Sequence, residues 1–122
     1  MQAAVVDLFC GVGGLTCGLK KSGLDVVAGL DNDPTCEFAY TENNNTKFIC
    51  EDVSNISSDL INNLFCNSKI KILVGCAPCQ TFSKQTNKYK NRIYDKKWTL
   101  LKSFAKHISC IQPDIVSMEN VP

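Results

Sequence analysis

The sequence predicts an α/β protein built on a parallel sheet of about five strands with helices on its faces. Short apolar runs of strand length alternate with amphipathic segments of helix length along the 122 residues. The first run, residues 3–9, is nearly continuously apolar, as expected of a central strand covered on both faces. Regular alternation of strands and helices indicates parallel pairing with right-handed crossovers, so we expect one domain with one sheet.

The first half of the chain contains three expected strands, at residues 3–9, 25–30 and 47–50. A helix is expected over residues 15–21. The next helix should begin where Asp33 caps it and Pro34 takes the first helical position, and it should fade in the polar turn at 43–45. Residues 56–65 predict a third helix, with an apolar face formed by Ile56, Leu60, Ile61, Leu64 and Phe65.

The second half adds two strands and a helix. The apolar run 72–74 predicts a fourth strand that ends at Gly75. Residues 81–97 lack periodicity and are rich in Lys, Asn and Thr, so we expect a mobile loop there. An amphipathic helix follows, marked by Trp98, Leu101, Phe104, Ala105 and Ile108. A fifth strand around residues 115–118 leads to Glu119.

Composition narrows the class of protein. The net charge is +1, no apolar run reaches the length of a membrane span, and no secretion signal begins the chain. We therefore expect a cytoplasmic protein without membrane contact. The eight cysteines lie mostly in apolar or periodic segments, which predicts reduced and mostly buried thiols. One Cys-x-x-Cys pair and one histidine do not make up a zinc site, so no metal is expected.

The charge is unevenly distributed along the chain. Residues 1–83 carry five lysines against nine acidic residues, whereas residues 84–106 carry eight Lys or Arg against one acidic residue. A basic block of this kind suggests a polyanionic partner. A solvated loop and helix face would explain the charge equally well.

The segment after the fourth strand contains the strongest candidate for catalysis. In open α/β sheets, ligands bind in the crevice beyond the carboxyl ends of the strands. Cys79 would lie there, between the rigid Pro78 and the polar Gln80. A free thiol has a pKa of about 8.5, so the site would have to activate Cys79 as a nucleophile. A buried structural thiol is the alternative.

A glycine-rich turn follows the first strand. Gly11, Gly13 and Gly14 permit a tight turn and let backbone N–H groups approach a ligand, but the third spaced glycine of the dinucleotide fingerprint is absent. Asp31, which ends the second strand, could hold a ribose diol. Asp52, which follows the third strand, could accept a hydrogen bond from a nucleobase amine. Either residue could instead be a helix cap.

Glu119 ends the fifth strand, which is expected beside the fourth strand. A lone glutamate is most often a surface residue. With Asn120 next to it and Cys79 on the neighbouring strand end, Glu119 becomes a candidate acid or hydrogen-bond partner, a role worth roughly 10²–10⁴ in rate.

Three motifs follow one another along the chain: Asp7-Leu-Phe-x-Gly-x-Gly-Gly14, Pro78-Cys79-Gln80 and Glu119-Asn120-Val121. Together they resemble the C5-cytosine DNA methyltransferases, which use S-adenosylmethionine. The resemblance implies a Rossmann-like S-adenosylmethionine-dependent methyltransferase fold, incomplete here. Residues 1–122 would be the N-terminal portion of the cofactor-binding and catalytic domain, without the target-recognition region and the C-terminal motifs.

The resemblance also implies roles for individual residues. Asp31 would hold the ribose, Asp52 would bind the adenine amine, and Asn32 stands where many members have an aromatic residue that stacks on adenine. The implied cofactor pocket consists of Asp7, Phe9, Gly11, Gly13, Gly14, Asp31, Asn32, Asp52, Pro78 and Leu100. The implied catalytic group consists of Cys79, Glu119, Gln80 and Asn120, with Cys79 attacking C6 of cytosine and Glu119 engaging its N3 edge.

The implied substrate is DNA. Its target base must be flipped out of the duplex to be reached. The basic stretch after the nucleophile would contact phosphates through Ser83, Lys84, Lys88, Lys90 and Arg92. A missing C-terminal portion or a partner chain would be required, so we expect the 122 residues to be inactive alone. A tRNA substrate stays open, because an RNA-acting branch of the family resembles the same motifs.

Two other functions remain as alternatives. A thiol–disulfide oxidoreductase would use Cys76 and Cys79, and would require this pair at the start of a helix. A non-catalytic half of a split methyltransferase would bind the cofactor or regulate a partner without carrying out chemistry.

Overall fold

The computed structural model describes residues 2–76 and 90–119, and for residues 90–97 it describes the backbone alone. The elements, in chain order, are β1 (Ala3–Leu8), α1 (Gly14–Lys21), β2 (Asp25–Asp31), the short 3₁₀ helix η1 (Pro34–Cys36), α2 (Glu37–Asn44), β3 (Lys47–Cys50), α3 (Ser58–Leu64), β4 (Ile70–Cys76), α4 (Lys90–Ile111) and β5 (Ile115–Glu119).

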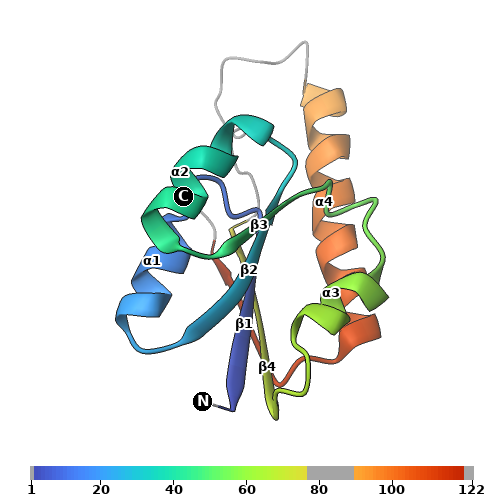
Figure 1. The fold of residues 1–122 in the computed structure, drawn as a ribbon. Coiled ribbons are helices and arrows are strands. Elements are labelled where there is room, and N and C mark those ends of the chain that lie inside the picture. The colour runs from blue at the N-terminus through green and yellow to red at the C-terminus, as the bar shows by residue number, and fades with distance from the viewer. Residues whose placement is uncertain (1, 77–89, 120–122) are drawn as a thin grey trace.

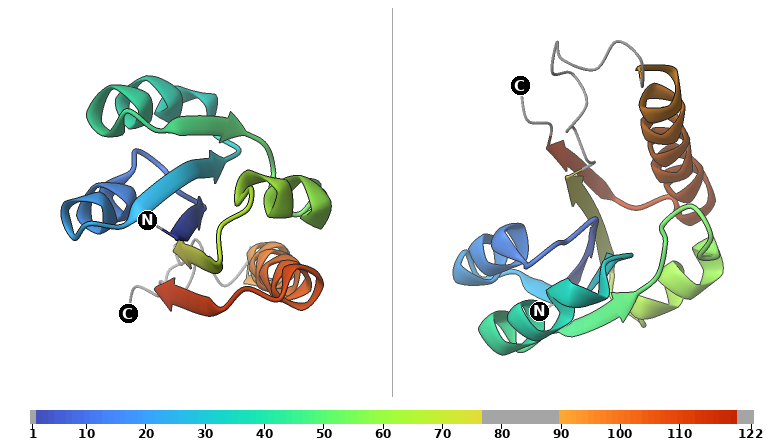
Figure 2. Two further views of the ribbon diagram at one scale, coloured as in Figure 1. Left: turned by 60° about the horizontal axis from the view of Figure 1, so that its bottom comes forward. Right: turned by 90° about the horizontal axis from the view of Figure 1, so that it is seen from above.

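The five strands form one sheet in the order β3-β2-β1-β4-β5, and all four pairings are parallel. Helices α1 and α2 lie on one face of the sheet, and α3 and α4 lie on the other (Figure 1 and Figure 2). The predicted α/β class, the parallel sheet and its flanking helices are therefore confirmed.

Strand β1 lies at the centre of the sheet, and all six of its residues are buried. Side chains alternate between the two faces of a strand. Ala4, Val6 and Leu8 belong to the larger core under α3 and α4, whereas Val5 belongs to the smaller core beneath α1. This double burial explains why the sequence of β1 is a nearly continuous apolar run.

The second predicted helix begins as expected but ends later. Asp33 caps η1 by accepting a hydrogen bond from the Thr35 amide at 3.0 Å, and Pro34 follows it, although this first turn is 3₁₀ and α2 continues from it. Helix α2 continues to Asn44, inside the stretch predicted as a polar turn, and ends at Asn45 in the left-handed conformation. That part of the prediction was wrong because Asn44 has buried partners, described below.

The loop predicted over residues 81–97 was wrong in its second part, because α4 begins at Lys90. Residues 81–89 lie outside the described part of the chain. Residues 90–97 are mostly polar and give no amphipathic signal, yet they contain neither Gly nor Pro and are rich in Lys and Arg, which favour helices.

The predicted apolar face of α3 is correct except at Leu60. Ile56, Ile61 and Phe65 are buried and Leu64 packs against the same core, but Leu60 is 58% exposed. The helix begins only at Ser58, so Leu60 lies in its first turn, on the solvent side of Ile61.

The expectation of mostly buried thiols was also wrong. Of the seven cysteines in the described residues, only Cys10 is buried, whereas three are half-buried and three are exposed. All seven are free thiols. In the described part of the chain, no helix has the length and apolar character required to cross a membrane.

Candidate functional site

The acidic residues singled out above gather at the carboxyl ends of the strands. Asp7 pairs with Gly29 of β2 and Val74 of β4, and Asp31 lies two residues beyond Gly29. Glu119 pairs with Cys76, two residues beyond Val74. Because side chains alternate along a strand, Asp7, Asp31 and Glu119 face the same side of the sheet, the side that carries α1 and α2.

Asp31 ties the glycine-rich turn to β2. Its Oδ2 accepts a hydrogen bond from the Gly11 amide at 2.9 Å, and its Oδ1 accepts one from the Asp33 amide at 2.9 Å. The carboxylate is half-buried and can accept further hydrogen bonds, since each oxygen has two lone pairs. Asp31 thus fixes the turn and remains able to bind a ligand hydroxyl.

The three glycines of the turn have different surroundings. Among the described residues, a Cβ on Gly11 or Gly14 would meet no other atom within 4 Å, so the backbone is open to a ligand at both positions. A Cβ on Gly13 would overlap the Asn44 side-chain amide and would lie 2.6 Å from a ring carbon of Tyr40. Gly13 is therefore required for packing, with φ at 91°, whereas Gly11 and Gly14 leave open space.

Asp7 lies beneath this turn and is only 1% exposed. Its Oδ2 accepts a hydrogen bond from the Thr16 hydroxyl at 2.7 Å, and its Oδ1 has no hydrogen-bond partner among the described residues. Burial raises the pKa of Asp7 to about 6; the Thr16 bond opposes this shift, and the charges of Glu119 and Asp31 add to it. Within the implied cofactor pocket, Asp7 is thus placed under the turn and not on its surface.

Three residues that the sequence reasoning missed complete this buried network. The Tyr40 hydroxyl lies 2.9 Å from the Thr16 hydroxyl, and burial raises the pKa of Tyr40, which keeps its proton available for donation. Asn44 donates from Nδ2 to the Tyr40 carbonyl at 3.0 Å. The sequence signal was weak: Tyr40 and Asn44 are one helical turn apart, on the face of α2 that packs on Gly13.

Asp52 organises the loop between β3 and α3. Its Oδ1 accepts hydrogen bonds from the Ser54 amide at 2.9 Å and the Ser54 hydroxyl at 2.6 Å. Its main-chain carbonyl accepts from the amides of Asn55 and Ile56. Asn32, the other residue implied near adenine, is exposed just beyond the end of β2.

Helix α4 reaches several parts of this region through its buried face. The Phe104 ring stacks on Phe9, with ring centroids 6.5 Å apart, and lies against Gly75 at the end of β4. Leu100, one turn closer to the carboxyl edge, is half-buried. His107, one turn further on, is 2% exposed and hydrogen-bonds the loop that follows β3.

The remaining predicted residues are described only in part. Pro78, Cys79, Gln80, Ser83, Lys84, Lys88 and Asn120 lie outside the described residues, and only the backbone is described for Lys90 and Arg92, which form part of the first turn of α4. Glu119 ends β5 beside Cys76, which ends β4. The convergence of Cys79 and Glu119 remains a prediction.

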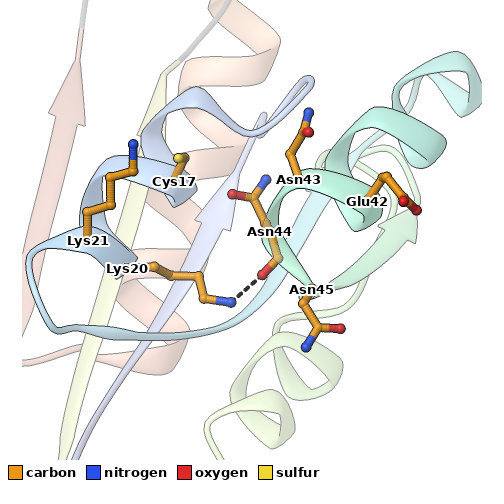
Figure 3. A pocket seen from close by; sticks show the side chains of 7 residues that line it. All are labelled: Cys17, Lys20, Lys21, Glu42, Asn43, Asn44 and Asn45. Carbon is orange, nitrogen blue, oxygen red and sulfur yellow. Dashed lines mark hydrogen bonds between the residues drawn. The ribbon is translucent and has the colours of Figure 1, made fainter.

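A pocket of about 360 Å³ lies elsewhere, between the last turns of α1 and α2 (Figure 3). Cys17, Lys20 and Lys21 line one side, and Glu42, Asn43, Asn44 and Asn45 line the other. The Lys20 ammonium bonds the Asn44 carbonyl across it and the Thr46 hydroxyl at 3.0 Å. Both helices begin at the carboxyl edge of the sheet and end here, so this pocket is separate from the predicted site.

Comparison with protein families gives a match to the C-5 cytosine-specific DNA methylase model over residues 3–122. Among curated proteins, the chain is 53% identical to the Type II methylase M.HgiDII of Herpetosiphon aurantiacus over 122 residues, which cover all of this chain and 34% of that protein. It is 31% identical to the Type II methyltransferase M.XorII of Xanthomonas oryzae pv. oryzae, covering 95% of this chain and 27% of that protein. The chain thus spans about a quarter to a third of the length of these relatives.

Solved structures agree on the fold. A prophage-encoded candidate DNA modification methyltransferase from E. coli has a TM-score of 0.76 at 30% identity, covering 98% of this chain and 32% of that chain. The S. pombe Dnmt2 methyltransferase has a TM-score of 0.72 at 19% identity, covering 97% of this chain and 34% of that chain, and supports the fold alone. The fold is thus the Rossmann-like fold of S-adenosylmethionine-dependent methyltransferases. Because the family match extends over residues 3–122, the chain belongs to the C-5 cytosine-specific DNA methylase family.

Proposed function

We propose that the protein containing this chain transfers a methyl group from S-adenosylmethionine to C5 of cytosine in DNA. In this proposal the chain supplies cofactor-binding residues and the nucleophile. The observation that carries it is the hydrogen bond from the Gly11 amide to Asp31, which joins an open glycine turn to an acidic residue at the carboxyl edge of the sheet. This is the position at which α/β sheets bind ligands.

The described residues fit the cofactor. The open space at Gly11 and Gly14 allows a ligand to approach the backbone. The carboxyl groups of Asp31 and Glu119 on this face favour a ligand with cationic sulfonium and ammonium groups. Asp31 holds the ribose hydroxyls in this proposal, and Asp52 accepts from the adenine amine. The bound cofactor supplies an electrophilic methyl group.

Cys79 and Glu119 act on the base in the proposed reaction. The Cys79 thiolate forms a bond to C6 of the flipped cytosine while Glu119 holds a proton at the N3 edge. Electron density then moves to C5, which would take up the methyl group as its bond to the cofactor sulfur breaks and S-adenosylhomocysteine leaves. Loss of the C5 proton and cleavage of the Cys79–C6 bond restore the aromatic base. Gln80 and Asn120 are proposed to support these two residues from neighbouring positions.

DNA contacts are proposed for the basic stretch after the nucleophile. Helix α4 begins at Lys90, so Lys90 and Arg92 stand on a helical backbone at the helix start. Together with Ser83, Lys84 and Lys88 they would bind phosphates, and each cationic contact would steepen the salt dependence of DNA binding.

The rest of the protein, or a partner chain, is proposed to cover β5. Ile115, Val116 and Met118 are exposed on this strand, which forms one edge of the sheet in the described residues. Exposed apolar edge strands are normally covered in folded proteins. We therefore expect the 122-residue chain to be inactive alone and to gain activity when the covering part is supplied.

The test is transfer of a labelled methyl group to cytosine-containing DNA and to tRNA, with and without the remaining part of the protein. The expected result is transfer to DNA by the complete protein, which Cys79→Ser abolishes. Methyl transfer by the 122 residues alone would refute the dependence on a further part. Assembly and cofactor binding without methyl transfer would favour the non-catalytic half.

A thiol–disulfide oxidoreductase would need Cys76 and Cys79 at the start of a helix, where thiol pKa values are typically lowered. Cys76 is the last residue of strand β4, and Cys79 lies outside the described residues. A redox titration of the Cys76/Cys79 pair checks this reading: a reversible two-electron couple that turns over with a dithiol substrate would favour it over methyl transfer.

A further inference from the structure

The buried His107 is bonded on both sides of its ring to one segment of the chain. Its Nε2 lies 2.7 Å from the Val53 carbonyl oxygen, and its Nδ1 lies 2.7 Å from the Ser58 hydroxyl. Because a carbonyl can only accept, Nε2 carries a proton and donates it to Val53. In the neutral ring, Nδ1 then accepts from Ser58.

The peptide group that accepts a hydrogen bond from His107 also donates one to Asp52. The Val53 carbonyl and the Ser54 N–H belong to the same peptide group, which is planar and rigid. The carbonyl accepts from His107, and the Ser54 N–H donates to Asp52 Oδ1 at 2.9 Å. A continuous chain of hydrogen bonds therefore leads from the His107 ring, through one peptide plane, to the carboxylate of Asp52.

We propose that His107 is a positioning residue for Asp52. By fixing the Val53–Ser54 peptide plane, it sets the direction from which the Ser54 amide holds the carboxylate, and hence where Asp52 meets the purine amine of the cofactor. This inference rests on the proposed role of Asp52. It adds that a residue of α4, more than 50 positions along the chain, controls how well the adenine end is recognised.

The surroundings of His107 support a directional role. Val53 and Ile56 are already buried in the core with Phe104 and Ile111 of α4, so apolar packing alone keeps the loop near the helix. Packing is non-directional and does not fix the rotation of a peptide plane. A hydrogen bond does so, and in a dry interior neighbouring hydrogen bonds in a chain strengthen one another.

Three substitutions separate the two bonds of the ring. Glutamine has its side-chain nitrogen as many bonds from Cα as Nε2 of histidine, so His107→Gln can still donate to Val53. Asparagine reaches only as far as Nδ1, so His107→Asn keeps a group near Ser58 and loses the bond to Val53. Ser58→Ala removes the other bond and leaves the Val53 contact in place.

The readout is the ratio of the dissociation constants of S-inosylhomocysteine and S-adenosylhomocysteine, measured by calorimetry on the full protein. These two probes differ at the purine position that Asp52 is proposed to recognise, so the ratio reports on Asp52 and is insensitive to a uniform loss of stability. We expect His107→Asn to lower the ratio about three- to tenfold, towards the value of Asp52→Asn. His107→Gln and Ser58→Ala should stay close to the wild-type ratio.

A His107→Asn protein that unfolds more easily but keeps the wild-type ratio would overturn the inference and leave a purely structural histidine. If His107→Asn fails to fold, His107→Gln decides. A folded His107→Gln protein whose ratio falls towards that of Asp52→Asn overturns the assignment to the Val53 bond. If Asp52→Asn itself leaves the ratio unchanged, Asp52 does not recognise the amine, and the proposed role of Asp52 fails together with this inference. A reduced ratio in Asp52→Asn with a normal ratio in His107→Asn overturns the inference alone.

Discussion

At the scale of single residues, the buried Asp7 makes the stability of the fold depend on pH. Its pKa is raised to about 6 in the folded protein, against about 3.8 in an unfolded chain. Between these values the folded state binds more protons than the unfolded state, so stability falls as pH rises. We expect Asp7 to lower the free energy of unfolding by up to about 3 kcal/mol between pH 4 and pH 7.

Urea unfolding of wild type and Asp7→Asn at several pH values measures this contribution. The free energy of unfolding of the wild type should fall relative to that of Asp7→Asn as the pH rises to about 6. Above about pH 6 the difference should be constant. Thr16→Val removes the hydrogen bond that opposes the shift, so the pH-dependent range should extend to higher pH. A difference that does not change with pH would show that folding does not raise the pKa of Asp7.

The glycines of the turn provide a matched pair of substitutions. Gly13→Ala forces a Cβ into Tyr40 and Asn44 at a φ of 91°, and should destabilise the fold by about 2–4 kcal/mol. Gly14→Ala meets no neighbour in the described part of the chain and lies in the first turn of α1, so its effect on stability should be neutral or slightly favourable. Because the space at Gly14 is where we propose that the cofactor approaches, Gly14→Ala should still weaken cofactor binding. Thermal unfolding and calorimetric titration measure the two effects, and normal cofactor affinity in Gly14→Ala would exclude a close approach there.

At the scale of secondary structure, the early start of α4 can be tested with proline. Lys97 lies in the interior of α4, whereas the sequence predicted a loop there. Proline in a helix interior removes a hydrogen bond and clashes with the preceding turn, at a cost of about 3 kcal/mol or more. Lys97→Pro should therefore destabilise the protein strongly in urea unfolding, and Lys97→Ala should not. Equal stabilities of the two variants would mean that residues 90–97 form a loop, as the sequence predicted.

The strands were predictable because each is marked by local sequence. The run of β1 is apolar on both faces, Asp31 marks the end of β2, and Gly75 lies one residue before the end of β4 at Cys76. The parallel pairing followed from alternation alone. The start of α4 was missed because a helix segment with little apolar patterning gives no periodic signal, and only the absence of Gly and Pro could have indicated it.

The site was predictable where backbone chemistry determines the residue, and not where tertiary contact does. The glycines of the turn and Asp31 were identified because a tight βα turn followed by an acidic residue is a local pattern. Tyr40 and His107 were missed, because their roles depend on the Thr16 hydroxyl and the Val53 carbonyl, which lie far away in sequence. A histidine three residues after Phe104, on the apolar face of a helix, was the one available signal for His107.

At the scale of the whole molecule, the exposed edge strand β5 allows a test of the proposal that a further part of the protein covers it. Ile115 is 51% exposed on β5 and Leu60 is 58% exposed on α3. If a further part of the protein covers β5, Ile115→Lys buries a charge in the complete protein, at a cost of roughly 2–4 kcal/mol, and costs little in the 122-residue chain. Leu60→Lys should change both proteins by less than about 0.5 kcal/mol, because nothing in the proposal covers α3. Urea unfolding measures the change in the free energy of unfolding for each variant in the 122-residue chain and in the complete protein. No change for Ile115→Lys in the complete protein would mean that β5 remains an open edge.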